Sequence, residues 1–483
     1  GFQEVEQMNL FKDMVCYQEE VRDPSRMAEV LNRVIEKAIR GSAPAQINVP
    51  RDYWTQVIDI DLPPIVRLER QAGGIVAINK AAKILSDSKF PVILSGAGVV
   101  IGDAIEDCKK LAEKLEAPVC SGYQHNDSFP GSHPLAVGPL GYNGSKAAME
   151  LISKADVVLA LGTRLNPFST LPGYGIDYWP KNAKIIQVDI NSDRIGLTKK
   201  VTVGICGDAK LVAQQLLSKL SSKAGDFERE KRKDLIHQTK SAWLQKLSSL
   251  DHEEDDPGTV WNAEARKRDK DRMSPRQAWR AIQAGMPDDV IISSDIGNNC
   301  AIGNAYPTFD KGRKYLAPGL FGPCGYGFPS ILGAKIGCPD TPVIGFAGDG
   351  AFGISMNEMS SCARKEWPAI SMVIFRNYQW GAEKRNSILW FDDNFIGTEL
   401  DPDLSFAKVA NACGLKGVTV RTMEETTKAI KQSCLDQKKG VTTFIEVILN
   451  QELGEPFRRD AMKKPVEVAG IKKADMKPQK SLI

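Results

Sequence analysis

The sequence predicts an α/β protein built on doubly wound parallel sheets, and three features support this expectation. Between residues 73 and 220, apolar runs alternate with helical patterns, as parallel strands do with their crossover helices. A second strand–helix–strand pattern spans residues 343–377. A charge-dense stretch at residues 223–273 lies between these regions, and we interpret it as a solvated helix and linker rather than a binding tail.

The composition is that of a globular protein with several domains. The chain has 483 residues, of which 42% are hydrophobic, and this is enough for ordinary cores. A net charge of +3 indicates neither a nucleic-acid nor a membrane surface. The ten cysteines lack CxxC or zinc spacing, which is typical of reduced thiols. With no long apolar run and no secretory leader, the sequence predicts a cytoplasmic protein without a membrane span.

The N-terminal stretch is too short for a complete domain. Apolar residues at helical spacing predict a helix over residues 24–39 that ends at Gly41, and residues 45–49 follow as a strand. Residues 57–72 contain prolines and no clear periodicity, so we expect a linker there.

The next region alternates strands and helices. The run SGAGVVIG follows its first strand but lacks GxGxxG spacing, so we interpret its glycines as structural rather than dinucleotide-binding. Further on, Ser274 and Pro275 have the residue types of a helix cap and first helical position, and they begin the last domain. The expected strands are 92–96, 118–119, 157–162, 185–190 and 290–293, and the expected helices are 105–115, 209–220 and 276–285.

The most informative stretch is residues 342–381. The apolar run at 343–347 predicts a buried strand that ends at a Gly-Asp-Gly turn, and we expect a helix at 354–367 and a second strand at 370–375. The strands of such a unit lie parallel, so Asp349 and Asn377 should meet at one sheet edge. A carboxylate and an amide oxygen suit Mg²⁺ that bridges a diphosphate, whereas an isolated Gly-Asp-Gly could be only a turn.

This pattern resembles the signature of thiamine diphosphate enzymes, with Arg376 in place of the first residue of the usual Asn pair. RNYQWGAEKRNSILWFDDNFIGTEL and NQELGEPFRRDAMKKPVEVAGI resemble the sulfoacetaldehyde acetyltransferases, within the acetolactate synthase-like branch. The resemblance implies the thiamine diphosphate-binding fold in three domains, the first incomplete. We expect part of a pyrimidine-binding domain (1–56), a linker (57–72), a central domain (73–222), a charged linker (223–273), a diphosphate- and Mg-binding domain (274–453) and a C-terminal tail (454–483).

The resemblance also implies the site. Asp349 and Asn377 would bind the metal by their side chains, and Gln379 by its backbone carbonyl. Cys324 stands where relatives place a large aliphatic side chain that bends the cofactor, and a thiol fills less space. A redox or nucleophilic role of Cys324 has no histidine nearby in sequence to support it. Asn298 and Asn299 would contact diphosphate, although they could simply cap the next helix. The expected cofactor-binding residues are Asn298, Asn299, Gly322, Cys324, Gly348, Asp349, Gly350, Ala351, Asn377 and Gln379.

For the reaction, the resemblance implies conversion of sulfoacetaldehyde and phosphate to acetyl phosphate and sulfite in sulfonate and taurine degradation. Acetolactate synthase or another 2-oxo acid carboligase or decarboxylase is the alternative. The polar segment GAEKR argues against it, and it directly follows residues 377–380, which we call the metal loop. A catalytically inactive regulatory relative is a further alternative, which the intact Asp349 and Asn377 disfavour. The candidate anion-binding residues are Arg376, Lys384, Arg385, Arg458 and Arg459.

The family's acid/base glutamate is expected upstream of Gly1, so no catalytic residue is assigned within this chain and the segment alone is expected to be inactive. Phe2 and Gln3 would line the mouth of the site, or Phe2 could pack in a core. The family forms its sites between subunits, which implies a homodimer or homotetramer. FAD occurs in the central domain of some relatives, and we expect a purely structural role here.

Overall fold

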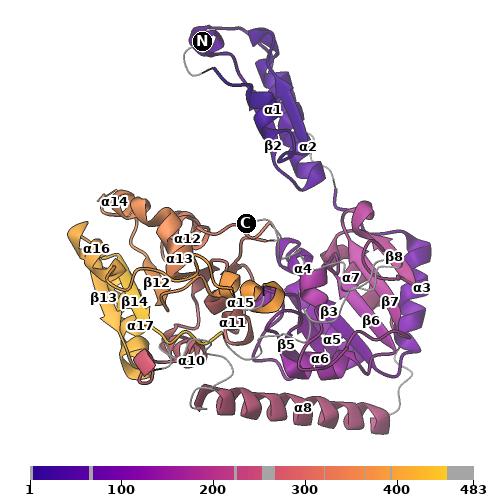
Figure 1. Ribbon diagram of the computed structural model, residues 1–483. Coiled ribbons are helices and arrows are strands. Elements are labelled where there is room, and N and C mark those ends of the chain that lie inside the picture. The colour runs from indigo at the N-terminus through magenta and orange to yellow at the C-terminus, as the bar shows by residue number, and fades with distance from the viewer. Residues whose placement is uncertain are drawn as a thin grey trace. The chain divides into compact units, whose positions relative to one another are not determined.

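The computed structural model describes residues 4–64, 69–221, 226–252, 267–319, 321–364, 366–391 and 394–453 (Figure 1). The chain separates into two compact units, Gly1–Arg70 and Gln71–Ile483. The boundary falls inside the stretch interpreted as a linker, and the second unit contains both large sheets. Within the described ranges, no helix is both long and apolar enough to cross a membrane.

The first unit pairs two parallel strands and packs a helix on them. β1 and β2 are joined from Tyr17 opposite Ala45 to Glu20 opposite Asn48. Val21, Val30 and Val34 form its small core. The predicted helix ends at Gly41 as expected, and the next residue adopts a left-handed conformation. The elements are α1 (Gln7–Phe11), β1 (Tyr17–Glu20), η1 (Pro24–Arg26), α2 (Met27–Gly41), β2 (Ala45–Asn48) and η2 (Arg51–Thr55).

The second unit begins with a parallel sheet of order β5-β4-β3-β6-β7-β8 among the described residues. The order runs outward from β3 in both directions, which is the doubly wound arrangement that the alternating pattern predicts. Its elements are α3 (Ile75–Ser86), β3 (Pro91–Ser95), α4 (Ala97–Ile101), α5 (Ile105–Leu115), β4 (Val119–Ser121), η3 (Asn126–Ser128), β5 (Ala136–Pro139), α6 (Lys146–Ile152), β6 (Val157–Leu161), η4 (Pro167–Thr170), β7 (Lys184–Asp189), η5 (Ser192–Arg194), β8 (Val203–Cys206) and α7 (Ala209–Lys219).

The glycine-rich run after β3 packs against the end of β6. The amide of Gly98 donates to the carbonyl of Gly162 at 2.8 Å. A Cβ atom on Gly98 would lie 2.7 Å from the Cα of Gly162, which is closer than packed carbon atoms approach. This close backbone contact explains the glycine without a bound dinucleotide and supports the structural interpretation.

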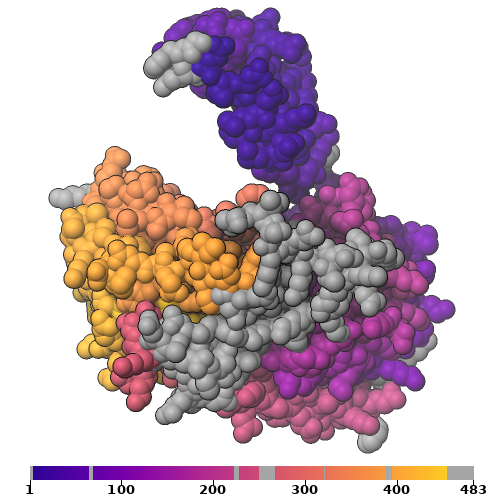
Figure 2. Space-filling view, viewed as in Figure 1, coloured from indigo at the N-terminus to yellow at the C-terminus, as the bar shows by residue number. Residues whose placement is uncertain are grey.

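A long helix then occupies much of the charged stretch. α8 (Asp226–His252) lies along the edge of the first sheet's domain at the surface (Figures 1 and 2). Ile236, Trp243 and Leu247 are buried, and Arg232 donates to the carbonyl of Leu115 at 3.1 Å. The expected solvated helix is therefore present, and it also anchors itself through an apolar stripe.

The second sheet is parallel as well, with order β10-β9-β11-β12-β14-β13 among the described residues. Ser274 caps its first helix in a capping box with Gln277, and Pro275 holds the first position, which confirms that expectation. Its elements are α10 (Pro275–Gly285), β9 (Ile291–Ser294), α11 (Asn298–Ile302), η6 (Gly303–Ala305), β10 (Tyr315–Leu316), α12 (Gly327–Gly337), β11 (Val343–Gly348), α13 (Asp349–Ser355), η7 (Met356–Glu358), α14 (Met359–Cys362), β12 (Ser371–Arg376), α15 (Gly381–Trp390), α16 (Phe406–Ala412), β13 (Lys416–Val420), α17 (Met423–Gln437) and β14 (Thr443–Ile448).

The helix expected over residues 354–367 is placed wrongly. The helical segment begins at Asp349, directly after the strand, and its last α-helical residue is Cys362. Gly350 is required there because a Cβ atom would lie 2.8 Å from the Trp380 ring, and Phe352 is fully buried in the core. Tertiary packing thus outweighs the poor helix propensity of the glycines.

Polar contacts join the two sheet domains within the second unit. Asn126 Nδ2 donates to the carbonyls of Asn304 and Pro307 at 3.0 and 2.8 Å. Asp127 Oδ2 accepts from the amides of Lys314 and Tyr315 at 2.9 and 3.2 Å. The side chains of Asn126 and Asp127 both belong to the connection after β4, so these hydrogen bonds fix that connection against the second sheet's domain.

Candidate active site

Asp349 and Asn377 lie where the sequence predicts, at the carboxyl edge of neighbouring strands. β11 and β12 pair in parallel with Gly348 opposite Phe375, so the residues that follow each strand are adjacent. Asp349 is 2% exposed and Asn377 is 1% exposed. A carboxylate and an amide are therefore buried together at one sheet edge.

The carboxylate of Asp349 is held by three donors. Its Oδ2 accepts from the amide of Tyr378 at 2.7 Å and from Arg376 Nη1 at 3.0 Å, and its Oδ1 accepts from the amide of Gly350 at 3.0 Å. Burial raises the pKa of Asp349 to about 6, while the Arg376 charge and these hydrogen bonds lower it. A cation at this carboxylate would favour its ionised form.

The amide oxygens beside Asp349 have no hydrogen-bond partner among the residues that the structure describes. Asn377 Oδ1 and Gln379 Oε1 are buried without a hydrogen bond from any described residue. Tyr378 between them has a φ of 62°, an unfavourable conformation that is stored more often at functional sites. An unused amide oxygen next to a carboxylate fits a hard cation such as Mg²⁺. No group of three or more His, Cys, Asp or Glu residues suited to a metal occurs in the described ranges, so carbonyl and amide oxygens would have to complete the site.

The two asparagines after β9 form the first turn of α11. The N-cap is Gly297, with a φ of 122°, and no side chain caps the helix. The alternative in which these asparagines only cap the helix is therefore wrong. Asn298 Nδ2 donates to the carbonyl of Leu453 at 2.6 Å, and Asn299 O accepts from Trp279 Nε1 at 2.7 Å. The Oδ1 atoms of both asparagines are buried and receive no hydrogen bond from the described part of the chain.

The segment that contains Gly322 and Cys324, both expected to bind the cofactor, is fixed by Asp295, a residue that the sequence pattern did not indicate. Asp295 accepts from the amides of Gly325 and Gly327 at 3.1 and 2.7 Å. Gly322 has a φ of 62°, which favours glycine. Burial, followed by the nearby acidic groups, raises the pKa of the Cys324 thiol, so the structure provides no activated thiolate.

A second missed residue, Gln451, ties the metal loop to the end of β14. Its backbone carbonyl accepts from Gln379 Nε2 at 3.1 Å, and its side-chain amide donates to Glu399 at 2.8 Å. Lys384 donates to the Oε1 atom of Gln451 at 3.4 Å and forms an ion pair with Glu399. Nothing in the local sequence signals the contacts of Gln451, because they join residues 52 to 72 positions apart.

The five Arg and Lys residues that are candidates for binding the substrate anions differ in how far other contacts already occupy them. Arg376 is 1% exposed and engages Asp349, Glu446 and two backbone carbonyls, so it is committed to the fold. Lys384 is committed to Glu399 and Gln451. Arg385 lies against Tyr142 of the first sheet's domain. Arg458 and Arg459, like Phe2 and Gln3, lie outside the described residues.

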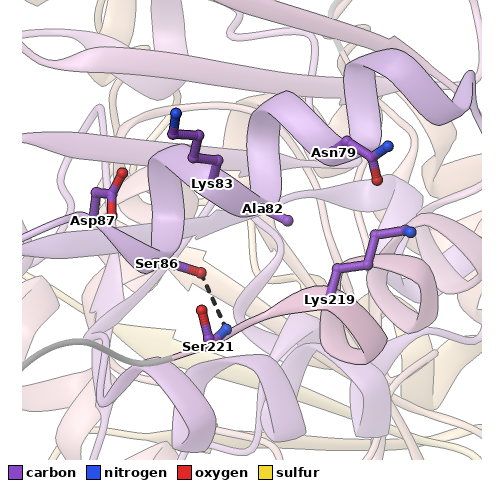
Figure 3. Close-up of a pocket in the computed structure, with 7 residues that line it drawn as sticks. All are labelled: Asn79, Ala82, Lys83, Ser86, Asp87, Lys219 and Ser221. Carbon is purple, nitrogen blue, oxygen red and sulfur yellow. Dashed lines mark hydrogen bonds between the residues drawn. The ribbon is translucent and has the colours of Figure 1, made fainter.

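A pocket elsewhere contains none of these groups. It has a volume of about 240 Å³ and lies against α3 and the end of α7, where the Ser221 amide donates to Ser86 Oγ at 3.2 Å (Figure 3). Its lining is Asn79, Ala82, Lys83, Ser86, Asp87, Lys219 and Ser221. It shares no residue with the predicted cofactor site.

Comparison with known families agrees with this architecture. Residues 78–216 match the family "Thiamine pyrophosphate enzyme, central domain", and residues 295–447 match "Thiamine pyrophosphate enzyme, C-terminal TPP binding domain". The fold and these matches define a thiamine pyrophosphate enzyme.

Sequence identity to individual relatives identifies the family more specifically. The chain is 76% identical to a probable sulfoacetaldehyde acetyltransferase of Rhizobium meliloti over 100% of this chain and 82% of the relative. It is 73% identical to a sulfoacetaldehyde acetyltransferase of Roseovarius nubinhibens over 99% of this chain and 79% of the relative. A probable acetolactate synthase large subunit of Methanocaldococcus jannaschii is only 29% identical, over 91% of this chain and 72% of the relative. The chain belongs to the sulfoacetaldehyde acetyltransferase family.

Proposed function

We propose that this enzyme converts sulfoacetaldehyde and phosphate to acetyl phosphate and sulfite with thiamine diphosphate and Mg²⁺. Relatives named for this activity support the reaction, and the buried pair of Asp349 and Asn377 supports the cofactor. The observation that carries the proposal is Asn377 Oδ1, which is buried beside a carboxylate without a hydrogen bond from any described residue.

The chain's own residues would bind and orient the cofactor. Asp349, Asn377 and the Gln379 carbonyl would hold Mg²⁺, and the backbone of Gly348, Gly350 and Ala351 would approach the diphosphate. Asn298 and Asn299 would contact diphosphate oxygens, with Gly322 and Cys324 at the aminopyrimidine. Thiamine diphosphate, when bound, supplies a nucleophilic carbon and an acceptor for negative charge at the substrate carbon.

The proposed reaction is balanced without an external oxidant. The C–S bond breaks and sulfite leaves, the aldehyde carbon reaches the acyl oxidation level, and the neighbouring carbon becomes a methyl group. A phosphate oxygen then bonds to the acyl carbon. Both co-substrates carry tetrahedral oxyanions, so fixed cations near the cofactor are required. Arg385, which lies against Tyr142, is the candidate among the described residues.

The test uses the intact enzyme expressed from the complete reading frame. Supplied with sulfoacetaldehyde and phosphate, it should release sulfite and acetyl phosphate in equal amounts, with both dependent on thiamine diphosphate and Mg²⁺. Acetolactate formed from pyruvate, without sulfite from sulfoacetaldehyde, would replace this proposal with the 2-oxo acid carboligase.

We also infer a cytoplasmic homodimer or homotetramer. Leu31, Ile35 and Ile39 form an apolar row on α2 and are 42%, 47% and 67% exposed, which suits a face covered by another subunit. Light scattering of the intact enzyme after size-exclusion chromatography should give two or four times the subunit mass, and a monomer at micromolar concentration would contradict the inference.

A further inference from the structure

Arg385 reaches from the metal-loop side of the second sheet's domain to a tyrosine of the first. It lies on α15, which begins two residues after Gln379, and its guanidinium carbon is 5.1 Å from the centre of the Tyr142 ring. Tyr142 lies between β5 and α6 and is 7% exposed. Its hydroxyl receives and donates no hydrogen bond within the described part of the chain, which is costly for a buried phenol unless a ligand supplies the partner.

Aromatic rings surround this contact. Tyr142 packs edge-on against Tyr123 and Phe168, with ring centres 6.3 and 6.2 Å apart. Burial raises the pKa of the Tyr123 phenol, and the charge of Arg385 opposes that rise. The Arg385 guanidinium therefore contacts a cluster of aromatic rings in the first sheet's domain. We call this cluster, Tyr123, Tyr142 and Phe168, the aromatic wall.

Asn304 links the aromatic wall to the second sheet's domain, which contains the expected cofactor-binding residues. Its Oδ1 accepts from the amide of Gln124 at 3.0 Å, and its Nδ2 donates to the carbonyl of Tyr142 at 3.1 Å. Asn304 follows α11, the helix that begins with Asn298 and Asn299. Gln124 is 3% exposed, and its Nε2 has no hydrogen-bond partner among the described residues.

These groups share one chemical property, since a guanidinium, a phenol and a carboxamide all present N–H or O–H donors. Burial lowers the pKa of Arg385, but a guanidinium stays charged, so this side chain brings a positive charge to the cluster of donors. Arg is the side chain whose planar donors match tetrahedral oxyanions best.

We propose that Arg385, Tyr142 and Gln124 form an oxyanion subsite at the junction of the two sheet domains, and that this subsite binds the phosphate or the sulfonate of the reaction. The inference rests on the proposed function for the identity of its ligand. It assigns substrate binding to the first sheet's domain, so that this domain contributes side chains to the site as well as structure.

The test replaces one donor at a time in the intact enzyme. Tyr142→Phe removes the hydroxyl and keeps the ring against Arg385, and Gln124→Glu places a carboxylate where the amide donor lies. Tyr178→Phe is the matched control, because it removes a buried phenol hydroxyl elsewhere in the same domain. Calorimetry with inorganic phosphate and with ethanesulfonate as probes measures binding without requiring turnover.

Tyr142→Phe should weaken binding of one probe by about tenfold and Gln124→Glu by more, because each changes a hydrogen bond to a charged group. The probe affected identifies the subsite as one for phosphate or for sulfonate, and the apparent KM of the corresponding substrate should rise in parallel. Cofactor affinity should stay at the parent value, and Tyr178→Phe should bind both probes normally.

Unchanged binding of both probes in both variants would overturn the proposal. So would a loss of thiamine diphosphate affinity equal to the loss of anion binding, since that pattern indicates a purely structural contact. Failure of the proposed reaction is distinguishable, because probe binding would still be lost in the variants even if the enzyme acted on another aldehyde.

Discussion

Arg376 Nη1 lies 3.0 Å from Asp349 Oδ2, and both side chains are 1% exposed. Arg376, which stands in place of the first Asn of the usual pair, thus forms an ion pair with Asp349, the carboxylate expected to bind the metal. Its Nη2 atom donates to the Leu404 carbonyl at 3.0 Å, and the guanidinium carbon lies 4.2 Å from the centre of the Tyr378 ring. A buried pair of this kind stabilises only while both partners are present.

Asp349→Asn should abolish Mg²⁺-dependent binding of thiamine diphosphate. The amide keeps the shape of the carboxylate but lacks the charge that a bridging cation requires, so calorimetric affinity for the cofactor in Mg²⁺ should fall at least about a hundredfold. Asp310→Asn, at an exposed carboxylate that accepts from the Ser132 amide, is the control and should bind normally. Parent-like affinity in Asp349→Asn would overturn the metal assignment.

Arg376→Lys should lower the free energy of unfolding without a selective effect on the apparent KM of either substrate. A lysine cannot serve the acceptors that the guanidinium fork reaches, so the free energy of unfolding should fall by about 1–3 kcal/mol. Urea denaturation measures this loss, and steady-state kinetics should show no selective rise in the apparent KM for phosphate or sulfoacetaldehyde. A tenfold rise for one anion in a variant of parent stability would instead restore Arg376 as a substrate ligand.

Asn377→Ala should mainly weaken cofactor binding, whereas Asn304→Ala should mainly lower the free energy of unfolding. Asn377 Oδ1 has no hydrogen bond from the described residues, whereas both ends of the Asn304 amide are bonded. The cofactor-free protein should therefore lose less than about 1 kcal/mol of unfolding free energy on Asn377→Ala, but about 1–3 kcal/mol on Asn304→Ala. Thiamine diphosphate affinity should fall chiefly in Asn377→Ala. Comparable destabilisation by both changes would mean that Asn377 is a structural residue.

The strands that build the candidate site are predictable because buried parallel strands form continuous apolar runs. β11 and β12 each lie within one residue of their predicted bounds, so the meeting of Asp349 and Asn377 follows from topology. The start of α13 does not follow from the sequence, because Gly350, which suggests a turn, is instead required by its close approach to the Trp380 ring. The roles of Gln451 and Tyr142 depend on contacts across domains or long sequence separations, and a local pattern contains no record of them.

His125 should make the protein lose stability as the pH falls. Burial, followed by the Arg164 charge, lowers the pKa of His125 to about 4, against an ordinary value of 6.5. Between these values the unfolded chain binds a proton that the folded chain excludes, so folding stability rises with pH in this window. The contribution is fully present above pH 6.5 and is lost as the pH falls through 4.

The size of this effect is bounded by the pKa difference at about 3 kcal/mol, and it should be smaller because the imidazole is partly exposed to solvent. Urea denaturation of the cofactor-free protein at pH 7 and pH 5 should show the loss, and His125→Gln should reduce the difference between the two pH values. Arg164→Met should reduce it in part, because it removes the second cause of the shift and leaves the burial. If the pH dependence of His125→Gln equals that of the parent, the histidine is not the group responsible.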